Sequence, residues 1–330
     1  MKNVTYFFRS QGYSIERVFN TVISGVNPLF FQVNKQFVRA YRFWPIGMLL
    51  NMFYCYRNRS QHINHITGDI HYCSLLLPRR NTILTIHDIV SLDYVISSNL
   101  VKNFVKFLWY YLPLKKLKYI TCISNNTKRL LVELFPWAEG KIRVIYNPVS
   151  PDYKLSKKEF NISSPTILHI GTNGNKNLER VIESLKDINC HLRIIGKLNT
   201  LQEELLKTYS IDFSIKSNLS DKEIVEEYVN CDIVSFPSLY EGFGMPIIEG
   251  QQTGRVVLTS NIEPLKEIAG DGALFVNPYD VAELSNGFKR IISDDKLRES
   301  LIYKGGKNVD RFSLQTIVLK YEELYNEILS

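Results

Sequence analysis

Apolar and polar positions in the second half of the chain alternate between two kinds of segment. Short apolar runs have the length and composition of buried strands, and they lie at 165–171, 191–197, 213–216, 232–238, 255–260 and 272–278. Segments with apolar residues at helical spacing separate them, at 177–188, 200–209, 221–230, 247–252, 264–270 and 280–292. Strands that alternate with amphipathic helices predict βαβ units, with a parallel sheet covered by helices on both faces.

The first half shows the same alternation less regularly. Its strand-like runs lie at 3–9, 29–34, 62–67, 82–88 and 118–124, and its helix-like segments at 14–23, 45–57, 99–112 and 126–135. Prolines and turn residues at 142–153 close this half. We therefore predict an α/β protein with two doubly wound, Rossmann-like domains, at 1–150 and 151–312. Two such domains in tandem would bind a ligand in the cleft between them, at the carboxyl ends of their strands.

Charge and cysteine content narrow the classes of partner. Residues 1–155 hold 20 Lys and Arg against 7 Asp and Glu, net +13, and residues 156–330 hold 20 against 26, net −6, which together give +7. The basic half favours an anionic partner, either a membrane surface or nucleic acid. The five cysteines are widely spaced and include no Cys-x-x-Cys pair, which predicts free thiols in a reducing compartment. The longest apolar stretch, 43–56, is shorter than the about 20 residues that span a bilayer.

The stretch SLYEGFGMPIIEGQQTG, at 238–254, places two carboxylates around a glycine turn. Glu241 follows a predicted strand, and Glu249 falls in or near the first turn of the next predicted helix. Backbone N–H groups at the start of that helix, at 242–245, favour an anion such as a phosphate. A carboxylate there can also accept two hydrogen bonds from a vicinal diol such as a ribose. Together these groups indicate a nucleotide-linked sugar, although an ordinary strand-turn-helix has the same spacing.

Two further loops carry candidate chemistry. In HIGTNGNKNLER, at 169–180, Gly171 and Gly174 allow a ligand to approach the backbone, and Lys176 can reach a diphosphate. The loop has neither the P-loop pattern nor the Gly-x-Gly-x-x-Gly pattern of dehydrogenases. His87 and Asp88 follow a strand-like run, where they could act as an acid or base or contact a hydroxyl. A purely structural histidine is the alternative.

Three segments of the second half resemble the family 4 glycosyltransferases of the GT-B fold. They are ILHIGTNGNKNLERVIESL, DIVSFPSLYEGFGMPIIEGQQTG and GRVVLTSNIEPLKEIAGDGALFVNPYD. The first half is similar to the acceptor domain of the same family through TILTIHDI, ITCISNNTKRLL and RVIYNPV. The last helix, 313–330, is similar to the one that crosses back to the N-terminal domain in that fold. The resemblance covers most of the chain.

The resemblance implies a retaining transferase that moves a hexose-type sugar from a nucleoside diphosphate sugar to a saccharide or lipid-linked saccharide, with no metal and no other cofactor. Glu249 would hold the ribose hydroxyls and Glu241 would orient the donor sugar. Lys176 would neutralise the leaving diphosphate, and His87 would lie near the reacting centre, so the implied catalytic residues are Glu241, Lys176 and His87. The implied donor-binding residues are Gly171, Thr172, Asn173, Lys176, Gly242, Phe243, Gly244, Met245 and Glu249.

The chain departs from the family pattern at three places. Thr172 stands where many relatives carry an arginine, and Gly12 is what remains of an N-terminal paired-glycine loop. Contacts to the diphosphate or the acceptor would then fall to Gly12, Asp88 or Lys197, with Arg9 as another candidate. Arg255 stands where a proline is frequent, which we expect to be neutral. No Asp-x-Asp pair is present to hold a divalent ion on the diphosphate.

We expect an enzyme of cell-surface polysaccharide or lipopolysaccharide synthesis in the cytoplasm, with peripheral attachment to the inner face of the plasma membrane as an open alternative. The segment 102–118 mixes lysines with aromatics, as an interfacial helix on anionic lipid would, or as a core helix with solvated lysines would. A nucleotide-sugar epimerase or sugar phosphorylase on the same fold remains a rival, and so does a non-catalytic scaffold subunit. Nucleic-acid binding rests on charge alone, and we expect none.

Overall fold

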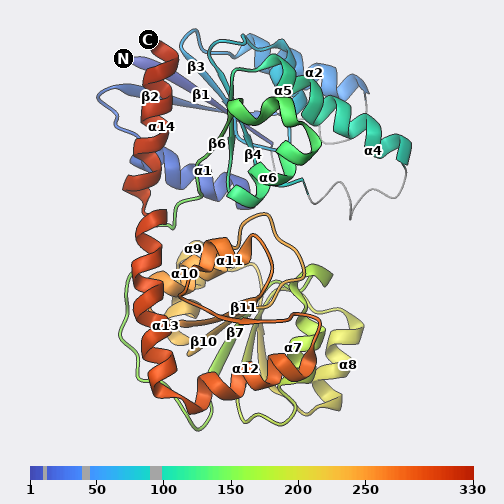
Figure 1. The fold of residues 1–330 in the computed structure, drawn as a ribbon, viewed down its shortest axis with the longest axis vertical. Coiled ribbons are helices and arrows are strands. Elements are labelled where there is room, and N and C mark those ends of the chain that lie inside the picture. The colour runs from blue at the N-terminus through green and yellow to red at the C-terminus, as the bar shows by residue number, and fades with distance from the viewer. Residues whose placement is uncertain (10–12, 39–44, 90–98) are drawn as a thin grey trace. The chain divides into compact units, whose positions relative to one another are not determined.

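The computed structural model describes residues 1–9, 13–38, 45–89 and 99–330. The chain forms two compact units (Figure 1), of which the first comprises Met1–Pro148 with Leu314–Ser330 and the second Val149–Ser313. The sequence had suggested a division at 150–151 and a separate final segment at 313–330. In the structure, that final segment is part of the first unit, where it packs against the first helix.

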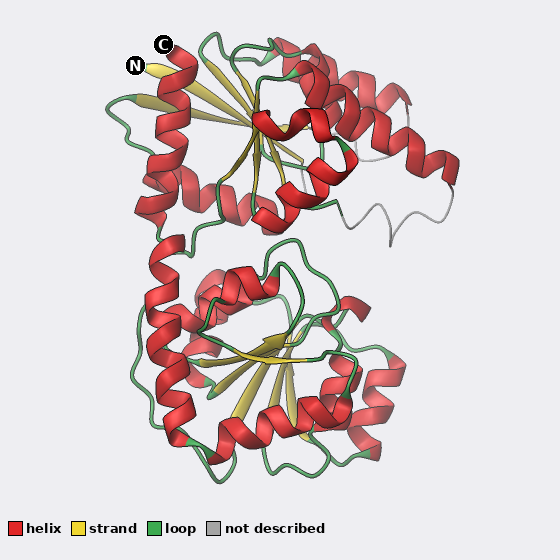
Figure 2. Cartoon of the chain, viewed as in Figure 1, coloured by secondary structure: helices red, strands yellow, loops and turns green. Residues whose placement is uncertain are grey.

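The first unit is a parallel sheet with helices on both faces (Figure 2). Its strand order is β2-β1-β3-β4-β5-β6, with bounds β1 Lys2–Arg9, β2 Phe31–Val38, β3 Ile63–Ile66, β4 Thr82–Ile86, β5 Tyr119–Cys122 and β6 Ile142–Val144. Its helices are α1 Tyr13–Gly25, α2 Pro45–Arg57, η1 His71–Leu76, α4 Asn99–Val105, η2 Lys106–Tyr111, α5 Leu112–Lys116, α6 Asn125–Leu134, η3 Pro136–Lys141 and α14 Leu314–Leu329.

Successive side chains of β1 pack into the two cores of this unit. Tyr6 and Phe8 lie in the core beneath α1 and α14, and Phe7 lies in the core beneath α2, η1 and α5. Side chains of a strand alternate between faces, so an unbroken apolar strand is what a sheet covered on both sides requires. The buried run that the sequence shows at 3–9 is therefore a central strand.

A buried polar network ties α14 to the sheet of the first unit. His65 Nε2 lies 2.7 Å from Thr85 Oγ1, and His65 Nδ1 lies 3.3 Å from the hydroxyl of Tyr325. Tyr325 also shares a hydrogen bond of 2.5 Å with Tyr6. Burial lowers the pKa of His65 from 6.5 to about 3, because the charged ring would lose its hydration. The ring is therefore neutral in the folded protein.

The single helix expected at 99–112 is instead three consecutive segments, α4, the π-helical turn η2, and α5. Pro113 lies at the start of α5 and has no N–H to give to the carbonyl four residues earlier, that of Trp109. The Trp109 carbonyl accepts from His71 Nδ1 at 3.1 Å. A π-helical turn and an external donor thus accommodate the proline.

The second unit repeats the architecture with the strand order β12-β11-β10-β7-β8-β9. The strands are β7 Thr166–Ile170, β8 His191–Ile195, β9 Asp212–Lys216, β10 Ile233–Phe236, β11 Val256–Ser260 and β12 Leu274–Val276. The helices are η4 Gly174–Lys176, α7 Leu178–Ser184, α8 Thr200–Thr208, α9 Asp221–Asn230, α10 Met245–Gln252, α11 Leu265–Ala269, α12 Val281–Ser293, α13 Asp295–Asn308 and η5 Val309–Phe312.

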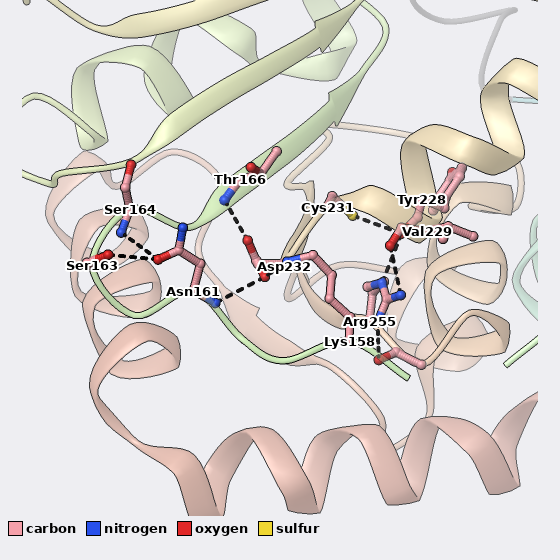
Figure 3. Close-up of polar contacts among 11 residues, drawn as sticks. Lys158, Asn161, Ser163, Ser164, Thr166, Tyr228, Val229, Cys231, Asp232 and Arg255 are labelled. Atoms are coloured by element: carbon pink, nitrogen blue, oxygen red, sulfur yellow. Dashed lines mark hydrogen bonds and ion pairs between the residues drawn. The ribbon is translucent and has the colours of Figure 1, made fainter. Parts of the chain in front are cut away.

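Charged side chains at the amino ends of β7 and β10 fasten the incoming chain to the second sheet (Figure 3). The buried Asp232 carboxylate pairs with Lys158 and accepts from the backbone N–H of Thr166 at 2.8 Å. Arg255 donates to the carbonyls of Tyr228 and Val229, both at 2.9 Å, in the last turn of α9. Arg255 therefore caps a helix, a role that its comparison with a frequent proline did not suggest.

Candidate functional site

An ion pair between two loops marks the carboxyl ends of β7 and β10. Lys176 Nζ lies 2.5 Å from Glu241 Oε1, and the two side chains are 22% and 14% exposed. Asn175 reinforces the pair, since its Nδ2 lies 3.4 Å from Glu241 Oε1 and 3.3 Å from the carbonyl of Tyr240. The structure thus brings together the lysine of one sequence motif and the first glutamate of the other, at the edge of the sheet where ligands of such folds bind.

The loop after β7 reaches this position through glycine and asparagine. Gly171 has a φ of +91°, and a Cβ there would lie 2.9 Å from the Lys176 side chain, so a larger residue would displace the lysine. Asn177 adopts the left-handed conformation at a φ of 64°, and its buried amide donates to the carbonyls of Pro237 and Pro278 at 3.1 and 2.7 Å. These bonds fix the loop against the end of β10.

The glycine turn after β10 leads into α10. Phe243 is buried and its ring meets that of Phe312 at 5.8 Å, so the turn is anchored from within. Gly244 precedes the helix with a φ of +117°, and a Cβ there would lie 2.8 Å from Leu265. Gly242 and Met245 are half-buried on either side of these anchors. Within the first turn of α10, Pro246 has no N–H and the Ile247 N–H donates to the Gly244 carbonyl at 3.0 Å, so an anion at this helix start would meet the backbone at 242–245.

Glu249 lies deeper than the sequence suggested. It is the fifth residue of α10, in the second turn and not the first, and it is only 8% exposed. Its Oε2 accepts a hydrogen bond of 2.5 Å from the hydroxyl of Tyr228 in α9. Burial and the neighbouring Glu249 carboxylate raise the pKa of Tyr228 well above 10, so the phenol stays a donor. Sequence reasoning missed this pair, because Tyr228 and Glu249 lie on different helices that meet only in the folded protein.

Thr172 organises the neighbouring loop. Its hydroxyl donates to the carbonyl of Lys197 at 2.6 Å, and its own carbonyl accepts from the buried Gln202 at 2.8 Å. Gly196 has a φ of +153° and packs against the Thr172 side chain. Lys197 is exposed in this loop, and so is Asn173 in its own. The turn after β8 therefore presents a lysine beside the loop that carries Thr172.

His87 and Asp88 lie in the first unit, just after β4. His87 Nε2 donates to the carbonyl of Thr67 at 2.7 Å, which leaves Nδ1 as the acceptor atom of the ring. Burial lowers the pKa of His87, although the Thr67 carbonyl and nearby carboxylates oppose the shift, so the ring is neutral at pH 7. Asp88 is half-buried, and its backbone carbonyl accepts a hydrogen bond from the Tyr110 hydroxyl. Arg9 pairs with Asp69 at 3.1 Å, and Gly12 lies outside the described residues.

A hollow of about 270 Å³ lies at the opposite end of the second sheet. Five of its six charged lining residues are bonded to one another or to backbone, namely Lys158, Asp232, Arg255, Asp295 and Arg298. Among the described ranges, no group of three His, Cys, Asp or Glu side chains could hold a metal ion. Within those ranges no helix is both long enough and apolar enough to cross a bilayer. All five cysteines are buried free thiols.

Comparisons with known proteins agree with this architecture. The family described as Glycosyl transferases group 1 matches residues 154–308, and Glycosyltransferase Family 4 matches residues 28–153. An O-antigen chain mannosyltransferase of Salmonella typhimurium is 26% identical over 300 residues, which cover 86% of this chain and 78% of the relative.

Solved structures share the whole fold. A sucrose-phosphate synthase of Thermosynechococcus elongatus superposes with a TM-score of 0.79 over 99% of both chains, at 15% identity. An Anabaena protein in complex with UDP and glucose superposes with a TM-score of 0.77 over 99% of this chain and all of the other, at 14% identity. The chain belongs to glycosyltransferase family 4 of the glycosyl transferases group 1, and it is a glycosyltransferase with the two-domain GT-B fold.

Proposed function

We propose that this glycosyltransferase transfers a hexose, with retention of anomeric configuration, from a nucleoside diphosphate sugar to a saccharide or lipid-linked saccharide of a surface polysaccharide. The Lys176–Glu241 pair carries the proposal, because it places a cation and a carboxylate in the loops that follow β7 and β10, with Glu241 directly before the glycine turn that leads into α10. The mannosyltransferase activity named for the Salmonella relative makes mannose the first sugar to test.

Each group has a chemical task in this proposal. Lys176 carries three donor hydrogens, so it can stay on Glu241 while it reaches a phosphate oxygen. Glu241 accepts hydrogen bonds from the hydroxyls of the donor sugar. Glu249 holds the ribose hydroxyls, with Tyr228 fixing its carboxylate. The amides at 242–245 and the loop at 171–173 bind the diphosphate and the sugar. Negative charge develops on the leaving diphosphate, so a cation placed there in advance lowers the barrier.

His87 serves the acceptor in this scheme. The Nδ1 atom is the free acceptor position of a neutral ring, because Nε2 donates to Thr67. A neutral imidazole can accept a hydrogen bond from the attacking hydroxyl and so orient it. Lys197 and Asp88 are further candidates for contacts to the diphosphate and the acceptor. Proton removal by the departing phosphate would complete the transfer without a protein nucleophile.

The reaction needs no metal ion in this proposal. Lys176, the helix start and Lys197 would neutralise the diphosphate in place of a divalent cation. Donor consumption in the presence of EDTA should equal that in magnesium. A strict requirement for added metal would contradict this part of the proposal and leave the choice of donor untouched.

The experiment offers GDP-mannose, UDP-glucose and other nucleoside diphosphate sugars with a lipid-linked saccharide acceptor. We expect release of one nucleoside diphosphate together with an acceptor adduct, and an α-linked donor should give an α-linked product by NMR. A β-linked product would contradict retention. A change of sugar configuration without adduct would favour an epimerase, a requirement for inorganic phosphate would favour a phosphorylase, and binding without turnover would favour a scaffold.

A further inference from the structure

Helix α2 is apolar on the face that it turns away from the core. Its inner face carries Met48 and Cys55, and both side chains are buried in the core. The outer face carries Ile46, Leu49, Leu50, Phe53 and Tyr56, of which Leu50 is 61% exposed and Phe53 57% exposed. The helix has no charged residue before Arg57. A surface helix normally shows polar residues outward, so a continuous apolar outer face indicates an interaction surface.

A second exposed apolar group lies on α4 and η2, where Val101, Phe104 and Phe107 are exposed. Helix α2 and the turn η2 both pack against η1. From α2, Asn51 Nδ2 donates to the hydroxyl of Tyr72 at 2.9 Å, and the Tyr72 ring meets that of Trp109 in η2 at 4.6 Å. Helix α2 and the turn η2 therefore cover the same core of the first unit. Figure 1 shows α2, α4 and α5 gathered at one side of this unit. We call the five residues of α2 and these three together the apolar face.

The stretches of chain that carry the apolar face are basic, and Asp69, whose backbone carbonyl accepts from Trp109 in η2, is paired with Arg9. Residues 45–68 and 99–132 contain no Asp or Glu. Arg57, Arg59, Lys102, Lys106 and Lys115 lie within these stretches. Apolar side chains beside basic ones are the composition that binds the interface of an anionic bilayer, because the basic side chains are attracted to the lipid headgroups. A second copy of this chain would set positive charge against positive charge, so the charges favour lipid over self-association.

The structure takes Lys116, one of the lysines of the 102–118 segment, out of this surface. Lys116 donates to the carbonyls of Ser74, Leu75 and Leu77 at 3.1, 2.6 and 2.6 Å, and burial lowers its pKa. It therefore caps η1 and does not face lipid. Reversing its charge would disturb the fold, so a loss of membrane binding in such a variant would prove nothing about lipid contact.

We infer that the apolar face is a docking surface for an anionic lipid bilayer, with α2 lying in the interface plane and its leucines and Phe53 inserted among the acyl chains. The inference does not depend on the proposed chemistry, because the face contains none of the candidate donor residues. Docking through the apolar face would hold the first unit at the membrane surface, where a lipid-linked saccharide resides. His87, which we assign to the acceptor, belongs to this unit.

The test is co-sedimentation of the full chain with phosphatidylcholine vesicles that contain or lack phosphatidylglycerol. We expect binding to the anionic vesicles that weakens at high salt. The triple variant Leu49→Ser, Leu50→Ser, Phe53→Ser should lower the partition coefficient by at least about 10-fold, because it removes three apolar side chains that would otherwise leave water. Neutralising Arg57, Lys102 and Lys106 to glutamine should lower binding at low salt by a similar factor.

The matched control is Leu155→Ser, Ile162→Ser, Leu201→Ser, which removes three comparably exposed apolar side chains from the second unit and should bind as the wild type does. A melting temperature for the α2 variant close to that of the wild type shows that it is folded. The inference is overturned if the wild type ignores anionic vesicles, or if the α2 variant binds them unchanged. It is equally overturned if sedimentation shows a wild-type dimer that the α2 variant abolishes.

Discussion

Lys176→Met should lower kcat for donor consumption by about 10²- to 10³-fold, the size of effect seen when one preorganised charge or donor at a developing anion is removed. The methionine keeps most of the side-chain volume that packs on Gly171 and Phe236. The loss should therefore appear in turnover and not in the melting temperature. Steady-state release of the nucleoside diphosphate measures it.

The matched control is Lys186→Met, which removes an exposed lysine of the same unit and should leave kcat within about twofold. Glu241→Gln should also lower kcat, because the amide cannot accept the same hydrogen bonds from the donor sugar. Full activity of Lys176→Met would contradict the role of the ion pair. Equal losses in Lys176→Met and Lys186→Met would show a general effect of charge and would contradict it as well.

The second large effect is acid destabilisation of the first unit. His65 and His71 have pKa values lowered by burial from 6.5 to about 3 and about 4, and burial also lowers the pKa of His87. The unfolded chain takes up these protons as the pH falls below 6.5, and the folded chain does not. Stability is therefore full above pH 6.5 and is lost as the pH falls from there toward the folded pKa values. His65 alone accounts for roughly 5 kcal/mol over that window.

Tryptophan fluorescence can follow this unit by itself, because Trp109 and Trp137 lie within it and the sequence of the second unit contains no tryptophan. Urea unfolding should show stability that falls between pH 7 and pH 5. The His65→Gln variant should be less stable at pH 7, because it loses contacts to Thr85 and Tyr325, yet its stability should fall less steeply, by up to about 1.4 kcal/mol per pH unit.

His169→Gln is the control for this measurement. His169 is buried in the second unit with a pKa lowered to about 3, so its loss should not change the pH dependence of the tryptophan signal. Stability of the first unit that is equal at pH 7 and pH 5 would contradict the neutral buried histidines. An unchanged slope in His65→Gln would assign the acid sensitivity to other groups.

Local periodicity predicted most of the elements. The expected helices at 45–57 and 221–230 have the same bounds as α2 and α9, and the run at 82–88 contains β4. The segment at 99–112 was wrong as a single helix, although Pro113 lies just beyond it. Apolar spacing shows which residues can share a helix face, but it does not show how a missing N–H is accommodated, and that depends on His71 far away in the sequence.

The candidate site could be predicted from the sequence only in part. Lys176 and Glu241 are 65 residues apart, and their loops could be expected to meet because both follow neighbouring parallel strands. The Tyr228–Glu249 hydrogen bond, the Arg255 cap and the Lys116 cap could not be read from the sequence. Each joins a side chain to a helix end or a helix face whose position is set only when the unit packs.

The most direct test of the donor site is the change in melting temperature with UDP, GDP, ADP, CMP and dTDP, each with and without magnesium, for the wild type, Glu249→Gln and Tyr228→Phe. A ligand that binds only the folded state raises the melting temperature by mass action. We expect one nucleoside diphosphate to stabilise the wild type without magnesium, Glu249→Gln to lose that shift, and Tyr228→Phe to keep most of it. A wild type that no nucleotide stabilises, or a Glu249→Gln variant that responds as the wild type does, would contradict the proposed donor site.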